Sequence, residues 1–154
     1  MGIEFRNVWR KADAAVASDA RGLWTELGVL PPAERESRAR ELCVVGYDGA
    51  RLVAISTAYV EPIQHLRQRF AFVRVLVHPD YRDRGVVVPL TVDANRVLET
   101  WAQTHPDEKV AGTAGIIITP GVMKGGYTTL GWVLVGYTPD NFPLVVNWFR
   151  HYRF

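Results

Sequence analysis

The sequence predicts a mixed α/β (α+β) fold, in which one mostly antiparallel sheet of about seven strands is flanked by helices. The predicted elements run strand, helix, an optional short helix, three strands, helix, strand, helix, strand, strand. A helical segment separates the strands around Phe70 and Ile118, and such a crossover places its two strands parallel. The chain has 154 residues, of which 48% are apolar. We therefore expect a single domain over residues 1–154 around one core.

The chain begins with a predicted strand and a predicted helix. Residues 3–10 alternate loosely between polar and apolar side chains, as strand residues do. The helix is indicated by an apolar stripe at helical spacing, with Asp13 near its start and Gly28 as a plausible stop. The stripe consists of Val16, Ala20, Leu23, Trp24 and Leu27. The polar stretch 31–41 is expected to form either a short second helix or a loop.

A hairpin and a central strand follow. The β-rich segments 41–47 and 51–60 flank Asp48-Gly49, whose residue types favour a two-residue hairpin turn. The next strand, 69–78, is apolar on both faces apart from Arg74, which is typical of a central strand, and Pro79 ends it. A second helical stripe comes next, and residues 110–119 predict another strand. This stripe consists of Leu90, Ala94, Val97, Leu98 and Trp101.

The last part of the chain is predicted to form two strands, the second of which would present an apolar edge to a second copy of the chain. Segment 121–130 suits a helix by its length and place, although Gly125-Gly126 weakens one there. Segments 133–137 and 144–151 predict strands around the turn 138–141. The aromatic run 148–154 on the terminal strand suggests an apolar edge, and exposed edges favour pairing. We therefore expect a homodimer, the alternative being that these rings pack under the first helix.

Charge and cysteine content exclude several classes of protein. The chain has 18 basic and 16 acidic residues, a net charge of +2, which is too small to indicate a nucleic-acid partner. Cys43 is the single cysteine, so neither an intramolecular disulfide nor a thiolate-rich metal site is expected. The first residues carry no export signal, and charged residues interrupt every long apolar stretch. We expect a cytoplasmic protein with no membrane, nucleic-acid or metal partner.

The segment 75–90 carries the chemistry that the sequence indicates. It leads from a strand through a short basic turn into a helix, whose first N–H groups lack internal acceptors and whose dipole favours an anion. Arg82 and Arg84 add full positive charges beside it, and Gly85 allows close approach to the backbone or a positive φ. Arg-x-x-Gly alone is weak evidence, because a solvated turn explains it about as well.

This turn resembles the pyrophosphate loop of the GNAT (Gcn5-related N-acetyltransferase) superfamily, whose pattern is Arg/Gln-x-x-Gly-x-Gly/Ala after a strand that ends in a Val-x-Pro-like sequence. Val77-His78-Pro79 ends the strand here, and Arg82, Asp83, Arg84, Gly85, Val86 and Val87 fill the loop. Tyr127-Thr-Thr-Leu-Gly131-Trp132 is similar to the family's Tyr-x-x-x-Gly-Phe. The predicted element order agrees with the GNAT fold over the whole chain. The resemblance implies that acetyl-CoA is the cosubstrate. It would be bound by Leu76, Val77 and the loop residues from Arg82 to Val88.

The sequence also departs from the family pattern. Val87 replaces the third small residue of the loop, and a branched side chain there would crowd the pyrophosphate. Pro120 stands where many members have Asn before the Tyr, which affects the pantetheine contacts expected in this region. Many members also carry a Glu base on the strand before the loop, and residues 70–78 contain none.

The resemblance implies direct attack of a neutral amine on the thioester carbonyl. Such a reaction needs a group that takes a proton from the ammonium, a donor to the oxyanion and a proton for the leaving thiolate. The Val77 amide would serve the carbonyl oxygen, and Tyr127 would be the acid, unless it is a hydrogen-bonded core residue. Glu61 and His78 are candidates for the base, with His65 or a water chain as alternatives. Glu61, His65 and His78 each also fit a solvated or structural role.

The sequence leaves three functions open. The leading one is transfer of an acetyl or similar acyl group from CoA to a primary amine of an unidentified small molecule or peptide. The second is a non-catalytic GNAT-fold protein that binds acyl-CoA or no ligand. The third, a basic nucleic-acid binder, is favoured only by the pI of 8.8 and the arginines, and the chain lacks recognisable motifs of that class.

Overall fold

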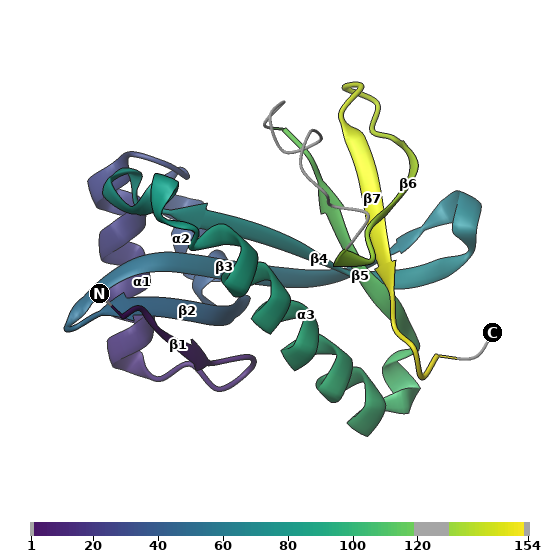
Figure 1. Ribbon diagram of the computed structural model, residues 1–154, viewed down its shortest axis with the longest axis horizontal. Helices are drawn as coiled ribbons and strands as arrows, with labels where there is room; N and C mark the ends of the chain where they lie inside the picture. The colour runs from purple at the N-terminus through teal and green to yellow at the C-terminus, as the bar shows by residue number, and fades with distance from the viewer. Residues whose placement is uncertain (1, 119–129, 153–154) are drawn as a thin grey trace. The chain divides into compact units, whose positions relative to one another are not determined.

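A computed structural model describes residues 2–118 and 130–152 and confirms the predicted fold class (Figure 1). The helices are α1 (Ala14–Leu27), α2 (Pro32–Ala39) and α3 (Val87–Thr104), with 3₁₀ turns η1 (Gln64–Leu66), η2 (Pro79–Arg84) and η3 (Pro106–Glu108). The strands are β1 (Glu4–Asn7), β2 (Leu42–Asp48), β3 (Arg51–Ile63), β4 (Gln68–Val77), β5 (Val110–Ile116), β6 (Val133–Tyr137) and β7 (Pro143–Trp148).

These strands form one mixed sheet in the order β1-β2-β3-β4-β5-β7-β6. The β4–β5 pair is parallel, with Phe70 opposite Gly112, so the predicted crossover through a helix is confirmed. The pairs β1–β2, β2–β3, β5–β7 and β6–β7 are antiparallel. Contacts between residues divide the chain into two compact units, which are described separately below. The prediction of a single domain stays a prediction.

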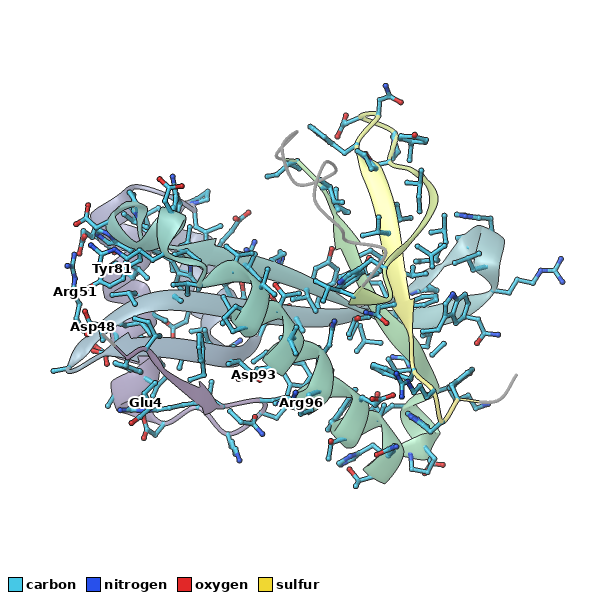
Figure 2. The ribbon with its side chains drawn as sticks, viewed as in Figure 1. Glu4, Asp48, Arg51, Tyr81, Asp93 and Arg96 are labelled. Carbon is cyan, nitrogen blue, oxygen red and sulfur yellow. The ribbon has the colours of Figure 1, made fainter. Side chains whose placement is uncertain are left out.

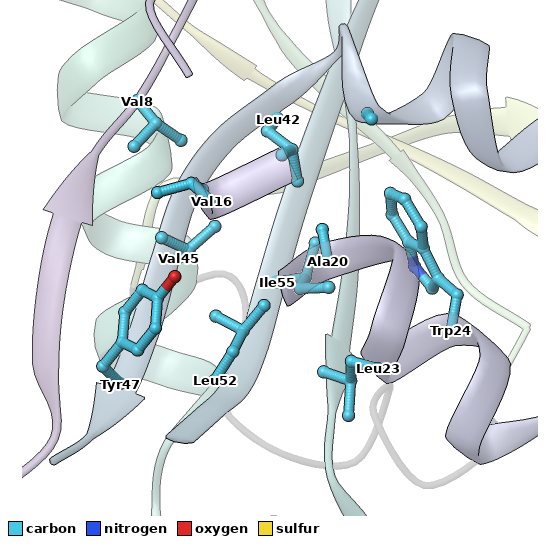
Figure 3. Close-up of a cluster of buried hydrophobic side chains, with 11 residues drawn as sticks. Val8, Val16, Ala20, Leu23, Trp24, Leu42, Val45, Tyr47, Leu52 and Ile55 are labelled. Atoms are coloured by element: carbon cyan, nitrogen blue, oxygen red, sulfur yellow. The ribbon is translucent and has the colours of Figure 1, made fainter. Parts of the chain in front are cut away.

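The first unit comprises residues 1–58 and 75–98, and its core lies between α1 and strands β2 and β3 (Figure 3). The predicted helix is confirmed: the Asp13 carboxylate accepts a hydrogen bond from the Val16 N–H at 2.9 Å, and Gly28 ends the helix at φ 64°. The buried side chains of α1 are Val16, Ala20, Leu23 and Trp24. They pack with Val45, Tyr47, Leu52 and Ile55 of the hairpin.

β2 contains a β-bulge, and a residue at the bulge contacts α3 within this unit. Leu42 pairs with Thr57 and Val45 with Ile55, so two residues of β2 face one residue, Ser56, of β3. The Ser56 hydroxyl accepts from the Val44 N–H and donates to the Val44 carbonyl, both at 2.8 Å, which satisfies the backbone at the bulge. The sulfur of buried Cys43 lies 4.0 Å from the Ala94 carbonyl oxygen of α3.

The second unit comprises residues 59–74 and 99–154, with its core on strands β4, β5 and β7. Phe70 is fully buried, and its ring meets the Trp148 ring edge-to-face at 5.0 Å. Tyr59 and Phe72 stack at 5.2 Å. Packing of these core side chains therefore joins β4 to β7, two strands that are distant in the sequence.

The terminal strand differs from the prediction in length and position. β7 ends at Trp148 rather than His151. The Phe149 N–H still donates to the Ala111 carbonyl of β5 at 2.9 Å. The Arg150 N–H instead donates to Glu99 Oε2 at 3.0 Å, away from the sheet ladder. β7 also lies between β5 and β6, so it is not an edge strand. Phe149 is buried, and Tyr152 donates its hydroxyl to Gln68 at 2.9 Å. The prediction that the terminal strand forms an exposed edge of the sheet was wrong. The homodimer that we inferred from it stays a prediction.

The hairpin turn differs from the sequence-based one, and the open question of a second helix is answered. Asp48 pairs with Arg51 as the last rung of the hairpin, so Gly49 and Ala50 form the turn instead of Asp48-Gly49. Gly49 has a φ of 60°, a conformation that glycine adopts without steric cost. The optional second helix is present as α2, which begins directly after Pro31.

Candidate anion-binding site

The loop between β4 and α3 has the geometry expected of an anion site. η2 ends at Gly85, whose φ of 69° and ψ of 28° are left-handed, and α3 begins at Val87. The Leu90 N–H donates to the Val86 carbonyl at 3.1 Å as the first turn of the helix. An α-helix that begins there leaves the N–H groups of Val87 and Val88 without intrahelical acceptors. These N–H groups and the helix dipole favour a bound anion.

The backbone around Gly85 is open to an incoming group. Arg82, Asp83, Arg84 and Gly85 are all exposed. A Cβ built on Gly85 would have no heavy atom within 4 Å. Val87, the departure from the family pattern, is 40% exposed, so its branched side chain lies at the surface. Pro89 lacks an N–H, which removes one donor from the first turn.

Both predicted cations of the loop have fixed contacts. The Arg82 Nε donates to the Val77 carbonyl at 3.1 Å, which ties the guanidinium to the end of β4. The Arg84 guanidinium carbon lies 4.9 Å from the centre of the Tyr81 ring, in cation–π contact. Leu76 packs against the core of the first unit, and Val77 is buried. The sequence-predicted residues 76–77 and 82–88 therefore lie in one unit, on consecutive segments.

Tyr81 anchors this loop to the hairpin (Figure 2). Its side chain is buried, and its hydroxyl donates to Asp48 Oδ2 at 2.6 Å. That hydrogen bond, together with burial, raises the pKa of Tyr81 above its ordinary value of 10.0, because the neutral phenol is the form that donates to the carboxylate. The Arg51 guanidinium also lies over the ring, 6.0 Å from its centre.

His78 is held at both ring nitrogens. Nδ1 accepts from the Asp80 N–H at 3.1 Å, so the neutral ring carries its proton on Nε2. Nε2 lies 2.7 Å from Glu26 Oε2, to which it can donate, and 3.0 Å from an Arg51 nitrogen. The residue is 6% exposed. With the proton on Nε2, the ring's lone pair is on Nδ1, so a base at this position would first have to release the Asp80 N–H.

The remaining predicted residues lie elsewhere. Glu61 is exposed on β3 in the second unit. His65, also in the second unit, contacts the Val135 carbonyl oxygen at 3.0 Å through Nε2. Tyr127 and Pro120 lie outside the described residues. Gly131, at the end of the Tyr127 match, has a φ of 93°, as a turn residue would.

Sequence reasoning missed Asp48 as a partner of this loop and Asn147 as a partner of the Gly131 turn. Asp48 is 33 positions from Tyr81, and its type suited a hairpin turn, so no local signal linked it to Tyr81. The Asn147 side-chain amide donates to the Leu130 carbonyl at 3.0 Å. Both contacts join segments that are distant in the sequence.

The described residues contain neither a metal-binding cluster nor a membrane-spanning helix. Residues 2–118 and 130–152 contain no cluster of three or more histidine, cysteine, aspartate or glutamate side chains placed to hold a metal ion. In the same ranges, no helix is both long enough and apolar enough to cross a bilayer.

Comparison with known proteins relates the chain to others through structure alone. No protein-family model matches the sequence, and no curated protein matches it. Among solved structures, the acetyltransferase of the GNAT family from Streptococcus pneumoniae matches with a TM-score of 0.60 at 13% identity, over 94% of this chain and 96% of that one. This likeness shows that the chain has the fold of GNAT acetyltransferases.

Two other neighbours carry ligands. N-acetylglutamate synthase from Neisseria gonorrhoeae, complexed with coenzyme A and N-acetyl-glutamate, matches with a TM-score of 0.53 at 11% identity, over 98% of this chain and 36% of that one. KacTA in complex with DNA matches with a TM-score of 0.65 at 14% identity, over 97% of this chain and 94% of that one. The second neighbour is at odds with the prediction that nucleic acid plays no part.

Proposed function

We propose that this chain is an acyl-CoA-dependent N-acyltransferase that transfers an acetyl group from acetyl-CoA to a primary amine of a small molecule or peptide. The observation that carries the proposal is the loop between β4 and α3: left-handed Gly85 lies just before an 18-residue helix, and two arginines, Arg82 and Arg84, come shortly before Gly85. A diphosphate is the group that such a loop suits, since it offers backbone donors, a helix dipole and bidentate guanidinium contacts.

In the proposed reaction, the amine nitrogen bonds to the thioester carbonyl carbon, the C–S bond breaks and CoA leaves as a thiolate. The amine must be neutral when it attacks, so a base, for which Glu61 is our candidate, takes its proton. The Val77 N–H would donate to the oxyanion as negative charge develops. Tyr127 would protonate the thiolate, as the resemblance implies. A phenol with a pKa of about 10 stays protonated at neutral pH and can act as an acid.

Binding is tested first, by thermal unfolding with and without acetyl-CoA. At about 100 times its dissociation constant, a ligand stabilises the native state by about 2.7 kcal/mol. At about 2 to 4 °C per kcal/mol, that is a shift in Tm of roughly 5 to 11 °C. A folded protein whose Tm responds to neither acetyl-CoA nor CoA would contradict the proposal.

A pair of glycine substitutions shows whether the loop is where binding occurs. Gly85→Glu places a carboxylate against the phosphates and should abolish the shift. Gly28→Glu is the matched control, because Gly28 has a φ of 64° against 69° for Gly85, and a Cβ at either position meets nothing within 4 Å. Both variants carry the same backbone penalty, and only the loop variant should lose the acetyl-CoA response.

The alternative is a non-catalytic GNAT-fold protein that binds acyl-CoA, favoured by Val87 in place of a small residue. Release of the CoA thiol in the presence of a broad panel of amines separates the two functions. Turnover supports the enzyme, and a Tm shift without turnover supports the binding protein. A separate titration with DNA and RNA tests the prediction that neither is a partner.

A further inference from the structure

The loop that carries Arg82, Arg84 and Gly85 has few packing contacts of its own. Residues 82–85 are exposed, and within residues 79–85 Tyr81 is the only buried side chain. Asp83 has a φ of −91° and a ψ of 21°, which interrupts the 3₁₀ geometry of η2. A short exposed segment with this geometry adopts one conformation only if something beyond its own residues holds it.

The hydrogen bond from Arg82 Nε to the end of β4 supplies one attachment, and Tyr81 supplies another, to the hairpin. Its hydroxyl reaches Asp48 Oδ2 at the end of β2, at 2.6 Å. Asp48 is itself fixed by pairing with Arg51 in the hairpin. The Tyr81 ring also contacts the loop's own cation, since the Arg84 guanidinium carbon lies 4.9 Å from the ring centre. One buried phenol therefore links the hairpin to a guanidinium of the candidate phosphate site.

We propose that the Tyr81–Asp48 hydrogen bond positions the diphosphate-binding loop, so that Tyr81 is a positioning residue for CoA rather than only a core residue. The inference rests on the proposed function. A loop that is ordered before binding loses less conformational entropy when the ligand binds. The ligand therefore binds with a lower Kd. Removing the hydroxyl should therefore weaken CoA binding through a residue that does not touch CoA.

The first unit contains a second tyrosine that serves as a matched control. The Tyr47 hydroxyl donates to Asp19 Oδ2 at 2.7 Å, and the Arg6 guanidinium carbon lies 4.2 Å from the ring centre. Tyr47 is 4% exposed and Tyr81 is 7% exposed. The Tyr47 pair joins β2 to α1, and these hydrogen-bond and ring contacts of Tyr47 are with Asp19 and Arg6 rather than with residues 79–88. The two tyrosines have similar surroundings, and only one of them is attached to the loop.

The experiment measures CoA binding by calorimetry in wild type, Tyr81→Phe and Tyr47→Phe, with the Tm of each. We expect both substitutions to lower Tm by similar amounts. Tyr81→Phe should raise the Kd for CoA about tenfold, and Tyr47→Phe should leave it within twofold of wild type. Dephospho-CoA, which keeps the diphosphate and lacks the 3′-phosphate, should lose the same factor as CoA in Tyr81→Phe.

The partner residue tests the mechanism and covers the case in which Tyr81→Phe does not fold. Asp48→Asn keeps an acceptor for the phenol and should retain most of the affinity, whereas Asp48→Ala should match Tyr81→Phe. In the Asp48→Ala background, Tyr81→Phe should have little further effect on Kd. A folded Tyr81→Phe or Asp48→Ala protein with a Kd for CoA within twofold of wild type would overturn the inference. If wild type binds no CoA, the proposed function itself fails, and the inference fails with it.

Discussion

The His78 Nε2 lies 2.7 Å from Glu26 Oε2, which joins the end of β4 to α1 within the first unit. The other ring nitrogen accepts from the Asp80 N–H, so the imidazole bridges a strand end, the start of η2 and a helix. Such a buried bridge favours a structural role, although the sequence also made His78 a candidate base.

We therefore expect His78→Asn to affect stability more than catalysis. The asparagine amide oxygen can still accept from the Asp80 N–H, and the contact with Glu26 is lost. Loss of this part-buried hydrogen bond, in which the Glu26 side chain is 53% exposed, should lower the free energy of unfolding by about 0.5 to 1.5 kcal/mol, while kcat stays above about a third of wild type.

Glu26→Ala is the control, because it removes the same contact from the other side and should cause a similar loss. A fall in kcat of about 10² to 10⁴, with a changed pH–rate profile, would instead identify His78 as the base.

The second prediction concerns the close approach of β5 and β7. A Cβ on Gly112 would lie 2.3 Å from the Asn147 carbonyl oxygen, a backbone atom that cannot move without disturbing the sheet. We expect Gly112→Ala to lower the free energy of unfolding by about 3 kcal/mol or more, since overpacking at a backbone contact is costly.

Gly115→Ala on the same strand is the matched control, because its Cβ would meet Val145 Cγ2 at an ordinary 3.7 Å. Urea unfolding of both variants checks this prediction. Equal stabilities would show that β7 does not lie this close to Gly112.

The third prediction concerns Cys43. Complete burial raises the pKa of its thiol from 9.0 to about 12, an effect that the Ser56 hydroxyl opposes in part. The folded-state pKa exceeds the unfolded one, so this contribution to stability is fully present below pH 9 and is lost as the pH rises from about 9 to about 12. At pH 10 the loss should be about 1.4 kcal/mol.

The free energy of unfolding at pH 8 and pH 10, in wild type and Cys43→Ser, measures this difference. Wild type should lose about 1.4 kcal/mol more than the variant. The native thiol should also react slowly with alkylating reagents at pH 8. Rapid alkylation of the native protein would contradict the burial of Cys43.

The fourth prediction concerns Tyr127, whose role is implied by its place before Gly131-Trp132 in the sequence. Tyr127→Phe removes only the hydroxyl. A general acid should lose about 10² to 10⁴ in kcat, or roughly 3 to 5.5 kcal/mol in the barrier, with little change in Tm.

A structural hydroxyl would show the opposite pattern, with lower stability and nearly unchanged kcat. Retention of more than about a third of wild-type kcat corresponds to less than about 1 kcal/mol and would exclude Tyr127 as the acid. Solvent would then be the expected proton donor.

Local patterns predicted the elements well because their signals lie within a few residues. The α1 stripe from Val16 to Leu27, its Asp13 cap and its Gly28 stop are all confirmed. An amphipathic helix can be predicted locally because its apolar side chains repeat at helical spacing. The loop from Arg82 to Gly85 was identified in the same way, because a strand, a basic turn and a helix start are adjacent in the chain.

Only the tertiary structure decided what those elements meet. The approach of Asn147 to Gly112 and the attachment of Tyr81 to Asp48 each join residues more than 30 positions apart, and β7 is placed between β5 and β6 rather than at the edge. Such contacts depend on strand order and register. They cannot be predicted from the residue types alone. The sequence by itself predicted most of the described elements and pointed to the loop as a candidate anion site, because both signals depend on neighbouring residues. The fold decided what holds that loop in place, because a hydrogen bond forms only between groups that the whole chain brings within reach.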